Sequence, residues 1–279
     1  MVNDLGGNAG GEGKDARAAD VVVNEIKATG GIAVPNYDSV EDGEKLVQTA
    51  LENFGRIDIL INNAGILRDK SVVRLSDSDW DLVHKVHLRG AFLTTRAAWP
   101  HMKNNKYGRI IMTASVAGLF GNFGQANYSA AKLGLVGLSN TLALEGGKYG
   151  IHSNVIVPMA ASRLTKDILP PDMYDSLAPE HIAPVVAWMC HEECEDNGLI
   201  VEALAGWAGR YRWQRSQGAA LLEKADGKVT PELVRSRWEE ITGMEDAYYP
   251  TTHQEATMDV MTRIQEKKMS PDEDDGEKT

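Results

Sequence analysis

The stretch Ile57-Asp58-Ile59-Leu60-Ile61-Asn62-Asn63-Ala64-Gly65 is typical of a buried β-strand that ends in a polar, glycine-containing turn. Short apolar runs bounded by turn residues are common in parallel sheets that are covered on both faces. Further strands are expected at 31–37, 109–113, 152–157 and 199–204, and helices at 16–29, 40–54, 76–104, 127–149 and 182–190. Because strands and helices alternate, the sequence predicts an α/β fold with a doubly wound, parallel sheet of Rossmann type.

Composition limits the functions that are open to the chain. It has 279 residues, of which 43% are hydrophobic, enough for a sizeable core. A formal net charge of −11 argues against a nucleic-acid partner, because little basic surface would neutralise phosphates. No run of about 18 apolar residues is present, so we expect no membrane span. Residues 1–14 lack the apolar segment of a signal peptide, and two cysteines favour a reducing compartment.

The pattern changes after Gly206, where short helical segments such as 231–240 replace the alternation of strands and helices. We therefore expect a nucleotide-binding domain at 1–206 and a helical C-terminal extension at 207–268. The tail at 269–279 is acidic and poor in apolar residues, a composition that predicts disorder.

A pair of reactive side chains stands out in Tyr128-Ser129-Ala130-Ala131-Lys132, with Ser115 thirteen residues before the tyrosine. Residues at i and i+4 share one face of a helix, so an ammonium would lie near the phenol and lower its pKa. Such a tyrosine can exchange a proton with an alcohol, and Ser115 could hold the reacting oxygen. The alternatives are a solvent-facing helical pair for Tyr128 and Lys132 and a helix or turn cap for Ser115.

A phosphate-binding loop is harder to find. A dinucleotide site needs a strand, a glycine-rich turn and the N-terminus of a helix. The early glycines lie in Gly6-Gly7-Asn8-Ala9-Gly10-Gly11 and at Gly13, and no apolar strand precedes them. We favour a flexible loop over a phosphate cradle. Similarly, Cys190-His191-Glu192-Glu193-Cys194 offers only half of a tetrahedral metal site, so we expect a helix end with buried cysteines and no metal.

These motifs together resemble the short-chain dehydrogenase/reductase family, and within it the (3R)-hydroxyacyl-CoA dehydrogenase unit of the peroxisomal multifunctional enzymes. The resemblance covers about residues 2–249, and the string at 121–132 is its most specific part. It is carried by Val2-Asn3-Asp4-Leu5-Gly6-Gly7, Asn63-Ala64-Gly65-Ile66-Leu67-Arg68-Asp69, Val86-His87-Leu88-Arg89-Gly90, Gly121-Asn122-Phe123-Gly124-Gln125-Ala126-Asn127-Tyr128, Ser162-Arg163-Leu164-Thr165 and Ala205-Gly206-Trp207.

In that family the strand order is 3-2-1-4-5-6-7, and the string at 2–6 ends the second strand. The resemblance therefore implies that this chain starts where strand two finishes. The central first strand, its glycine turn and the first helix are expected to be missing from it, which would leave strands two and four without a neighbour.

The resemblance also assigns roles to the site residues. Tyr128 would be the general acid/base, Lys132 would lower its pKa and bind the nicotinamide ribose, and Ser115 would orient the alcohol. The wider family often has an asparagine where this chain has His87. For His87 a proton relay and a purely structural role both remain open.

The same resemblance predicts NAD as the cofactor. Asp4 would bind the adenosine ribose hydroxyls and repel a 2′-phosphate, which favours NAD over NADP. Asp38 would contact the adenine. The remaining positions line the cofactor by backbone approach or close over its carboxamide: Asn63, Ala64, Gly65, Pro158 and Thr165. In the family a glycine often follows this proline, whereas this chain has Met159. The resemblance is therefore weaker for the loop that would close over the carboxamide.

The expected function is the NAD-dependent oxidation of a (3R)-hydroxyacyl-CoA to a 3-ketoacyl-CoA in peroxisomal fatty-acid β-oxidation. Two alternatives remain: a cofactor-less, catalytically silent module that acts as an interaction surface, and a steroid or polyol dehydrogenase of the same family. The resemblance further implies a homodimer, a hydratase domain in a longer form and a peroxisomal location, although this chain does not end in a peroxisomal Ser-Lys-Leu signal.

Overall fold

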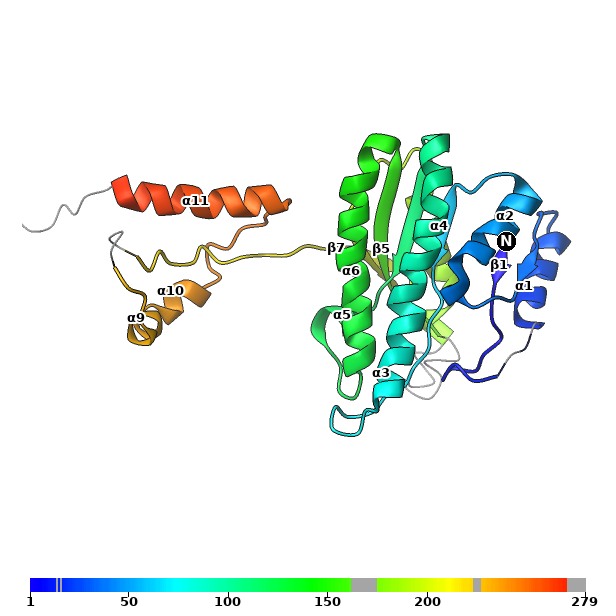
Figure 1. Ribbon diagram of the computed structural model, residues 1–279, viewed down its shortest axis with the longest axis horizontal. Helices are drawn as coiled ribbons and strands as arrows, with labels where there is room; N and C mark the ends of the chain where they lie inside the picture. The colour runs from blue at the N-terminus through cyan, green and yellow to red at the C-terminus, as the bar shows by residue number, and fades with distance from the viewer. Residues whose placement is uncertain (14, 16, 162–174, 223–226, 270–279) are drawn as a thin grey trace, which may run out of the picture. The chain divides into compact units, whose positions relative to one another are not determined.

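The computed structural model describes residues 1–13, 15, 17–161, 175–222 and 227–269 (Figure 1). Contacts between residues divide the chain into two compact units, Met1–Tyr211 and Arg212–Thr279. The candidate site residues that the structure describes all lie in the first unit.

The first unit contains a five-stranded sheet in the order β3-β4-β5-β6-β7. Its first four strands pair in parallel, and the last pair is antiparallel. The prediction of a largely parallel, Rossmann-like sheet is therefore confirmed. The strands are β3 (Ile59–Asn62), β4 (Gly108–Thr113), β5 (Ile151–Met159), β6 (Ile200–Leu204) and β7 (Trp207–Tyr211).

Strand β7 was not expected, since residues 207–211 were assigned to the helical extension. Only Ala205 and Gly206 separate it from β6, and both have positive φ angles, 45° and 80°. A two-residue loop with this geometry is the tight hairpin turn that suits the twist of paired strands. Alanine rarely adopts a positive φ, so the sequence signal was weak. The first unit consequently ends at Tyr211, beyond the expected boundary at 206.

A separate sheet at the start of the chain has two parallel strands, β1 (Val2–Asn3) and β2 (Pro35–Asn36), joined through helix α1 (Arg17–Ala28). The strand expected at 31–37 is thus only two residues long. A 3₁₀ turn, Val40–Asp42, and helix α2 (Gly43–Phe54) lead from β2 to β3.

Strands β1 and β3 end their respective sheets, and they are the strands between which the family order places its first strand. The loops that follow them touch, because the Leu67 N–H donates to the Ala9 carbonyl at 2.9 Å. Ile59 and Ile61 were expected to be buried but are 46% and 48% exposed. They lie on the face of β3 opposite Asn62, whose amide meets α4 (Gly90–Asn105). This edge strand is therefore covered on one face only.

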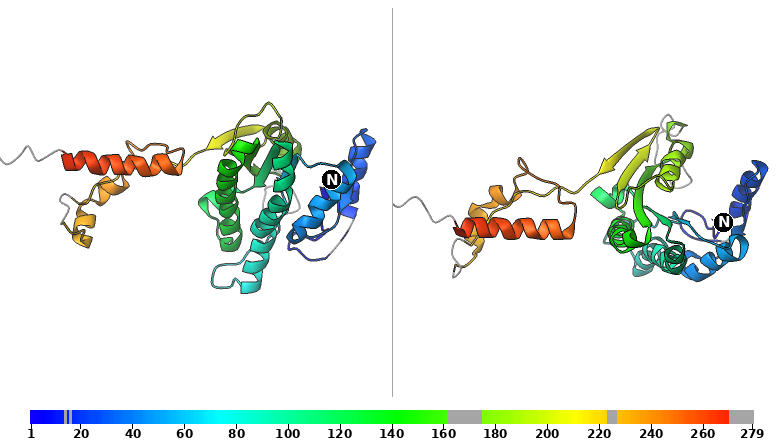
Figure 2. Two further views of the ribbon diagram at one scale, coloured as in Figure 1. Left: turned by 45° about the horizontal axis from the view of Figure 1, so that its top comes forward. Right: turned by 90° about the horizontal axis from the view of Figure 1, so that it is seen from above.

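Helices enclose the rest of the sheet. Figure 2 shows α4 and α6 (Ala126–Gly146) on one face and α8 (Ala183–Met189) on the other. The expected helix at 76–104 is α3 (Asp77–His84) and α4 joined by a π-helical turn, Lys85–Arg89. Shorter elements are α5 (Val116–Phe120) and the 3₁₀ turns Gly147–Tyr149, Asp175–Leu177 and Pro179–His181.

The core follows the two-residue period of the strands. Along β4, Ile110 and Met112 pack with Met102 and Leu135 on the side of α4 and α6. Ile111 points the other way and packs with residues around α8. Strand β4 is buried along its whole length, so the polar residues that follow it sit at a fixed edge of the sheet.

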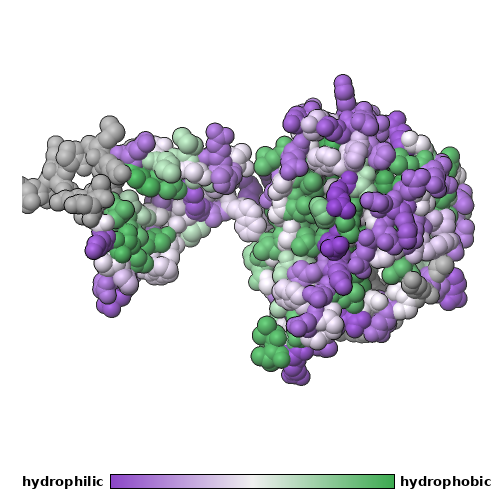
Figure 3. Space-filling model, in the orientation of Figure 1, coloured by the Kyte–Doolittle hydropathy of each residue, from purple (hydrophilic) through white to green (hydrophobic). Residues whose placement is uncertain are grey.

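The second unit contains α9 (Pro231–Ser236), α10 (Trp238–Thr242) and α11 (His253–Met269). None of its side chains whose burial is described, at 212–222 and 227–265, is buried. Apolar surface is visible on it in Figure 3, and the exposed residues include Trp213, Trp238 and Met258. None of the described helices of either unit has the length and apolarity needed to cross a membrane.

Candidate active site

The candidate site lies where parallel strands end, which is the ligand-binding edge of open α/β sheets. Ser115 follows β4 by two residues, Tyr128 and Lys132 lie in the first turns of α6, and His87 comes from the π-helical turn. The His87 and Tyr128 rings meet edge to face at 5.3 Å, and Lys132 Nζ lies 5.5 Å from the centre of the Tyr128 ring. The structure therefore brings the four predicted residues together.

The phenol does not have the lowered pKa that the sequence predicted. Burial raises the pKa of Tyr128, a hydrogen bond from Ser115 partly offsets this rise, and the Asp69 carboxylate adds to it. Lys132 Nζ instead donates to the Thr113 carbonyl at 2.5 Å. Burial lowers the pKa of Lys132 to about 7, so this amine is only partly charged at neutral pH. A partly charged amine at this distance is a weak stabiliser of phenolate.

Ser115 has the capping role that was one of the two interpretations left open by the sequence. It is the N-cap of α5, where its Oγ accepts a hydrogen bond from the Ala117 N–H at 3.2 Å. Its hydroxyl also lies near enough to the Tyr128 phenol to lower the pKa of that group. One hydroxyl has a proton and two lone pairs, so capping and orientation are compatible.

His87 is neutral in the physiological range. Burial is the main cause that lowers its pKa to about 3, and the nearby Lys132 charge adds to this. Its Nε2 lies 3.0 Å from the Ile66 nitrogen and 2.8 Å from the Ile66 oxygen. Its Nδ1 is buried and has no hydrogen-bond partner among the described residues. The backbone contacts of Nε2 support the structural role, and Nδ1 remains available to a ligand.

The structure leaves no room for a side chain at position 65. A Cβ there would lie 2.5 Å from His87 Cε1. Gly65→Ala should therefore displace the imidazole and lower the free energy of unfolding by about 1–3 kcal/mol, the usual cost of overpacking. Urea unfolding would measure this cost. The matched control is Gly137→Ala in α6, where an added Cβ meets nothing within 4 Å. If both variants were equally stable, the proposed contact with His87 would be wrong.

The two predicted adenosine contacts follow the small sheet. Asp4 comes directly after β1, and its Oδ1 accepts a hydrogen bond from the Gly6 N–H at 2.7 Å. The carboxylate of Asp38 accepts from Asn36 Nδ2 at 3.0 Å and lies 4.0 Å from Lys45 Nζ. Both carboxylates are thus fixed at the carboxyl ends of neighbouring parallel strands.

The hydrogen bonding of the glycine-rich loop at 5–13 argues against a phosphate cradle. The N–H groups of Gly6, Asn8, Gly10, Gly11 and Glu12 all bond acceptors within residues 4–12. A phosphate site needs several free N–H groups that point at one place. The sequence favoured a flexible loop, whereas these bonds and the Arg68 Nε contact with the Gly10 carbonyl at 2.6 Å hold the loop in place.

The remaining predicted positions differ in how they are placed. Asn63, Ala64 and Gly65 follow β3 directly, and Asn63 Oδ1 accepts a long hydrogen bond of 3.4 Å from Thr113 Oγ1. Pro158 lies within β5, opposite Ala203 of β6. Thr165 lies outside the described residues.

The nicotinamide end of a dinucleotide fits these residues. When charged, Lys132 has three N–H donors, and among the described residues it donates to the Thr113 carbonyl alone. A ribose diol would supply further acceptors to this buried amine. The unpartnered His87 Nδ1 and the side-chain-free Gly65 border the same place.

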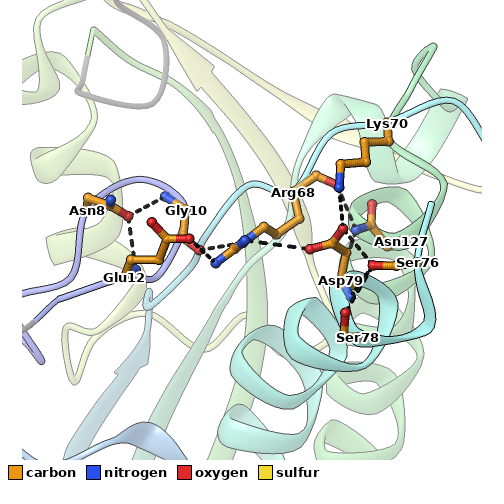
Figure 4. A network of polar contacts seen from close by, with 9 residues as sticks. All are labelled: Asn8, Gly10, Glu12, Arg68, Lys70, Ser76, Ser78, Asp79 and Asn127. Carbon is orange, nitrogen blue, oxygen red and sulfur yellow. Dashed lines mark hydrogen bonds and ion pairs between the residues drawn. The ribbon is translucent and has the colours of Figure 1, made fainter. Parts of the chain in front are cut away.

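A partly buried polar network beside α6 was missed from the sequence. It joins Asn8, Gly10 and Glu12 to Arg68 and Lys70, and these to Asp79 of α3 and Asn127 of α6 (Figure 4). Asn127 directly precedes Tyr128 and is fully buried. The signal that could have drawn attention to it was an amide side chain directly before Tyr128.

The cysteine motif behaves as expected for a helix end. Cys190 caps α8, and both Cys190 and Cys194 are buried and free. Burial raises the pKa of Cys190 to about 11, so its thiol is unreactive at neutral pH. Across the described ranges, no group of three or more histidine, cysteine or acidic side chains could hold a metal ion.

Comparisons with known proteins agree with this site. The profile of the family described as "short chain dehydrogenase" matches residues 13–168. The chain is 56% identical over 274 residues to peroxisomal multifunctional enzyme type 2 of Mus musculus, covering 97% of this chain and 37% of that protein. It is 56% identical over 252 residues to the peroxisomal hydratase-dehydrogenase-epimerase of Neurospora crassa, covering 90% of this chain and 28% of the relative.

A solved structure gives the same result. Full-length peroxisomal multifunctional enzyme type 2 of Drosophila melanogaster superimposes with a TM-score of 0.80 at 46% identity, over 89% of this chain and 44% of that one. This chain thus spans less than half the length of each of these three relatives. Members of this family are oxidoreductases that typically use a nicotinamide cofactor. By its sequence profile, its fold and its relatives, the chain belongs to the short-chain dehydrogenase/reductase family.

Proposed function

We propose that the chain is the unit that oxidises a (3R)-hydroxyacyl-CoA to a 3-ketoacyl-CoA with NAD. The observation that carries the proposal is the meeting of Ser115, Tyr128 and Lys132 at the carboxyl edge of the sheet. The string at 121–132 links this geometry to relatives named as peroxisomal multifunctional enzymes and hydratase-dehydrogenase-epimerases. No observation favours a steroid or polyol as the substrate.

In the proposed reaction Tyr128 removes the hydroxyl proton of the substrate, and Ser115 holds the same oxygen by hydrogen bond. Lys132 would hold the nicotinamide ribose and, when charged, would stabilise the phenolate. NAD, when bound, would supply the acceptor for the hydride that leaves C3 of the substrate. Because burial raises the pKa of Tyr128, the phenol is protonated at neutral pH in the protein alone, which makes the charge on Lys132 decisive for oxidation.

Support for NAD over NADP comes from Asp4. Its carboxylate at the end of β1 would accept hydrogen bonds from ribose hydroxyls and repel a 2′-phosphate. Asp38 at the end of β2 would border the adenine.

The proposal extends to partners and location. The relatives are named as peroxisomal, so we propose a peroxisomal role in fatty-acid β-oxidation, with a hydratase domain in a longer form of the protein. A homodimer is supported by exposed apolar residues on α4 and α6, namely Phe92, Leu133 and Leu144. Such residues would be covered if these helices packed on a second copy.

Titration of NADH fluorescence with the protein tests the proposal. We expect an increase in nucleotide fluorescence on binding, and addition of NADPH should give a weaker response. Joining a strand, a Gly-x-x-x-Gly-x-Gly turn and a helix to the N-terminus should strengthen NADH binding, because these supply free N–H groups for the pyrophosphate. Absence of binding by this chain at millimolar NADH would refute the enzymatic role for the chain by itself.

A second candidate function is a catalytically silent interaction module. It is favoured by the loop at 5–13, whose N–H groups are largely bonded internally. Under this alternative the extended chain would also fail to bind NADH, whereas the dehydrogenase proposal requires that it binds.

A further inference from the structure

The catalytic helix α6 begins without the usual side-chain cap. Its N-cap residue is Gln125, which makes no capping hydrogen bond. The Gln125 amide is used elsewhere, since Nε2 donates to Asp69 Oδ2 at 2.7 Å and Oε1 accepts from Asn122 Nδ2 at 2.9 Å. The first N–H groups of a helix have no backbone acceptor within the helix, so the N–H of Tyr128 needs an acceptor other than a backbone carbonyl of α6.

Asn127 supplies that partner. Its Oδ1 accepts the hydrogen bond from the Tyr128 N–H at 2.8 Å. Its Nδ2 donates to the carbonyls of Arg68 at 3.1 Å and Asp79 at 3.4 Å. The side chain is 0% exposed, so every partner of this amide is protein (Figure 4). The backbone of Tyr128 is thereby tied through one side chain to two other segments.

The segment that Asn127 holds is itself firmly anchored. The Arg68 guanidinium donates to the Gly10 carbonyl at 2.6 Å and pairs with Glu12 at 3.2 Å and Asp79 at 3.6 Å. Lys70 Nζ pairs with Asp79 at 2.8 Å.

The same segment runs beside the residues that lead into α6. The Lys70 N–H donates to the Gly124 carbonyl at 2.8 Å, Asp69 holds Gln125, and Arg68 holds Asn127. Three consecutive residues thus each fix one residue of the segment 124–127. The anchoring reaches the loop after β1, helix α3 and the start of α6.

We propose that Asn127 is a positioning residue for Tyr128. Through its hydrogen bonds, Asn127 fixes the backbone of the reacting tyrosine relative to the segment 68–70. The phenol must reach Ser115 while its ring stays beside His87 and Lys132, and these groups come from two other parts of the fold and from a later turn of α6. Hydrogen bonds tolerate errors of only a few tenths of an ångström. The inference rests on the proposed role of Tyr128 as the acid/base group.

The titration of the Tyr128 phenol tests this role without substrate or cofactor. In protein that carries ¹³Cζ-tyrosine, the Tyr128 resonance is assigned by its loss in Tyr128→Phe. Asn127→Ala should admit water around the ring and lower its titration midpoint toward the ordinary value of about 10, because burial is the main cause that raises it. The charged groups near the ring, Lys132 and Asp69, remain in the variant. The matched control is Asn53→Ala, an exposed amide of α2.

The outcomes separate positioning from simple stability. A lower melting temperature with an unchanged Tyr128 titration would show that Asn127 is only structural and would overturn the proposal. If Asn127→Ala does not fold, Asp79→Asn replaces it, because this isosteric change weakens the anchoring of Arg68 and Lys70 without touching α6. It should shift the midpoint in the same direction by less, and no shift would again overturn the proposal.

Kinetics distinguish this proposal from the proposed function. In a form of the chain that binds NADH, Asn127→Ala should lower kcat and leave the affinity for NADH unchanged. Full activity of Tyr128→Phe would refute the proposed reaction while leaving the titration result intact. A shifted titration with unchanged kcat would refute positioning for catalysis and leave the reaction standing.

Discussion

Tyr128→Phe should lower kcat for (3R)-hydroxyacyl-CoA oxidation by about 10²–10⁴-fold, the usual contribution of a positioned acid/base group. Phenylalanine keeps the ring beside His87 and Lys132 and removes only the hydroxyl that meets Ser115. The change should therefore leave folding and NADH affinity nearly unaltered. Steady-state kinetics and an NADH fluorescence titration, in a form of the chain that binds NADH, measure the two quantities separately.

The pH profile adds a sharper test of the same residue. A phenol whose pKa is raised is protonated at neutral pH, so oxidation by the native protein should accelerate as pH rises. Reduction of the ketone, which uses the protonated phenol, should slow over the same range. The matched control is Tyr149→Phe, because Tyr149 comes just before β5 and so lies at the amino ends of the parallel strands, opposite the site. Retention of most turnover by Tyr128→Phe would contradict the assigned role.

The architecture was predictable because burial follows simple periods. The buried run at 109–113 and the helical run at 127–149 became β4 and α6 with small changes at their ends. The placement of the candidate residues was predictable for the same reason, since Ser115 follows a strand and Tyr128 and Lys132 share a helix. Local pattern and tertiary structure agree at these positions.

Two features depended on information that no local pattern contains. The hairpin that ends in β7 depends on a positive φ at Ala205, which the residue type disfavours. The pKa of Tyr128 depends on how deeply the ring is buried and on where Lys132 Nζ points. The i, i+4 spacing correctly placed the amine near the phenol, but it could not show that the amine is buried enough to lose charge itself.

Lys132 should lower the free energy of unfolding, because its buried amine faces a carbonyl and, among the described residues, no carboxylate. Burial lowers its pKa from 10.5 to about 7, which corresponds to a penalty of up to about 5 kcal/mol at 1.36 kcal/mol per pKa unit. Lys132→Met keeps an unbranched apolar stem and removes the amine. The variant also leaves the buried Thr113 carbonyl without its donor, which lowers the free energy of unfolding by about 1–3 kcal/mol. We therefore expect a net gain of about 2 kcal/mol or more near neutral pH and loss of activity.

The pH dependence of this gain identifies its cause. The unfolded chain holds the Lys132 proton up to about pH 10.5, whereas the folded chain releases it above about pH 7. Between these values the unfolded state binds more protons, so the stability of the native protein rises with pH. The advantage of Lys132→Met should accordingly be largest below pH 7 and fall as the pH rises toward 10.5, where only the cost of the lost bond to the Thr113 carbonyl remains. Urea unfolding at pH 6, 8 and 10 measures it, with the exposed Lys27→Met as the control. An equal gain at all three pH values would show that the amine is not desolvated, and that the variant gains stability by packing alone.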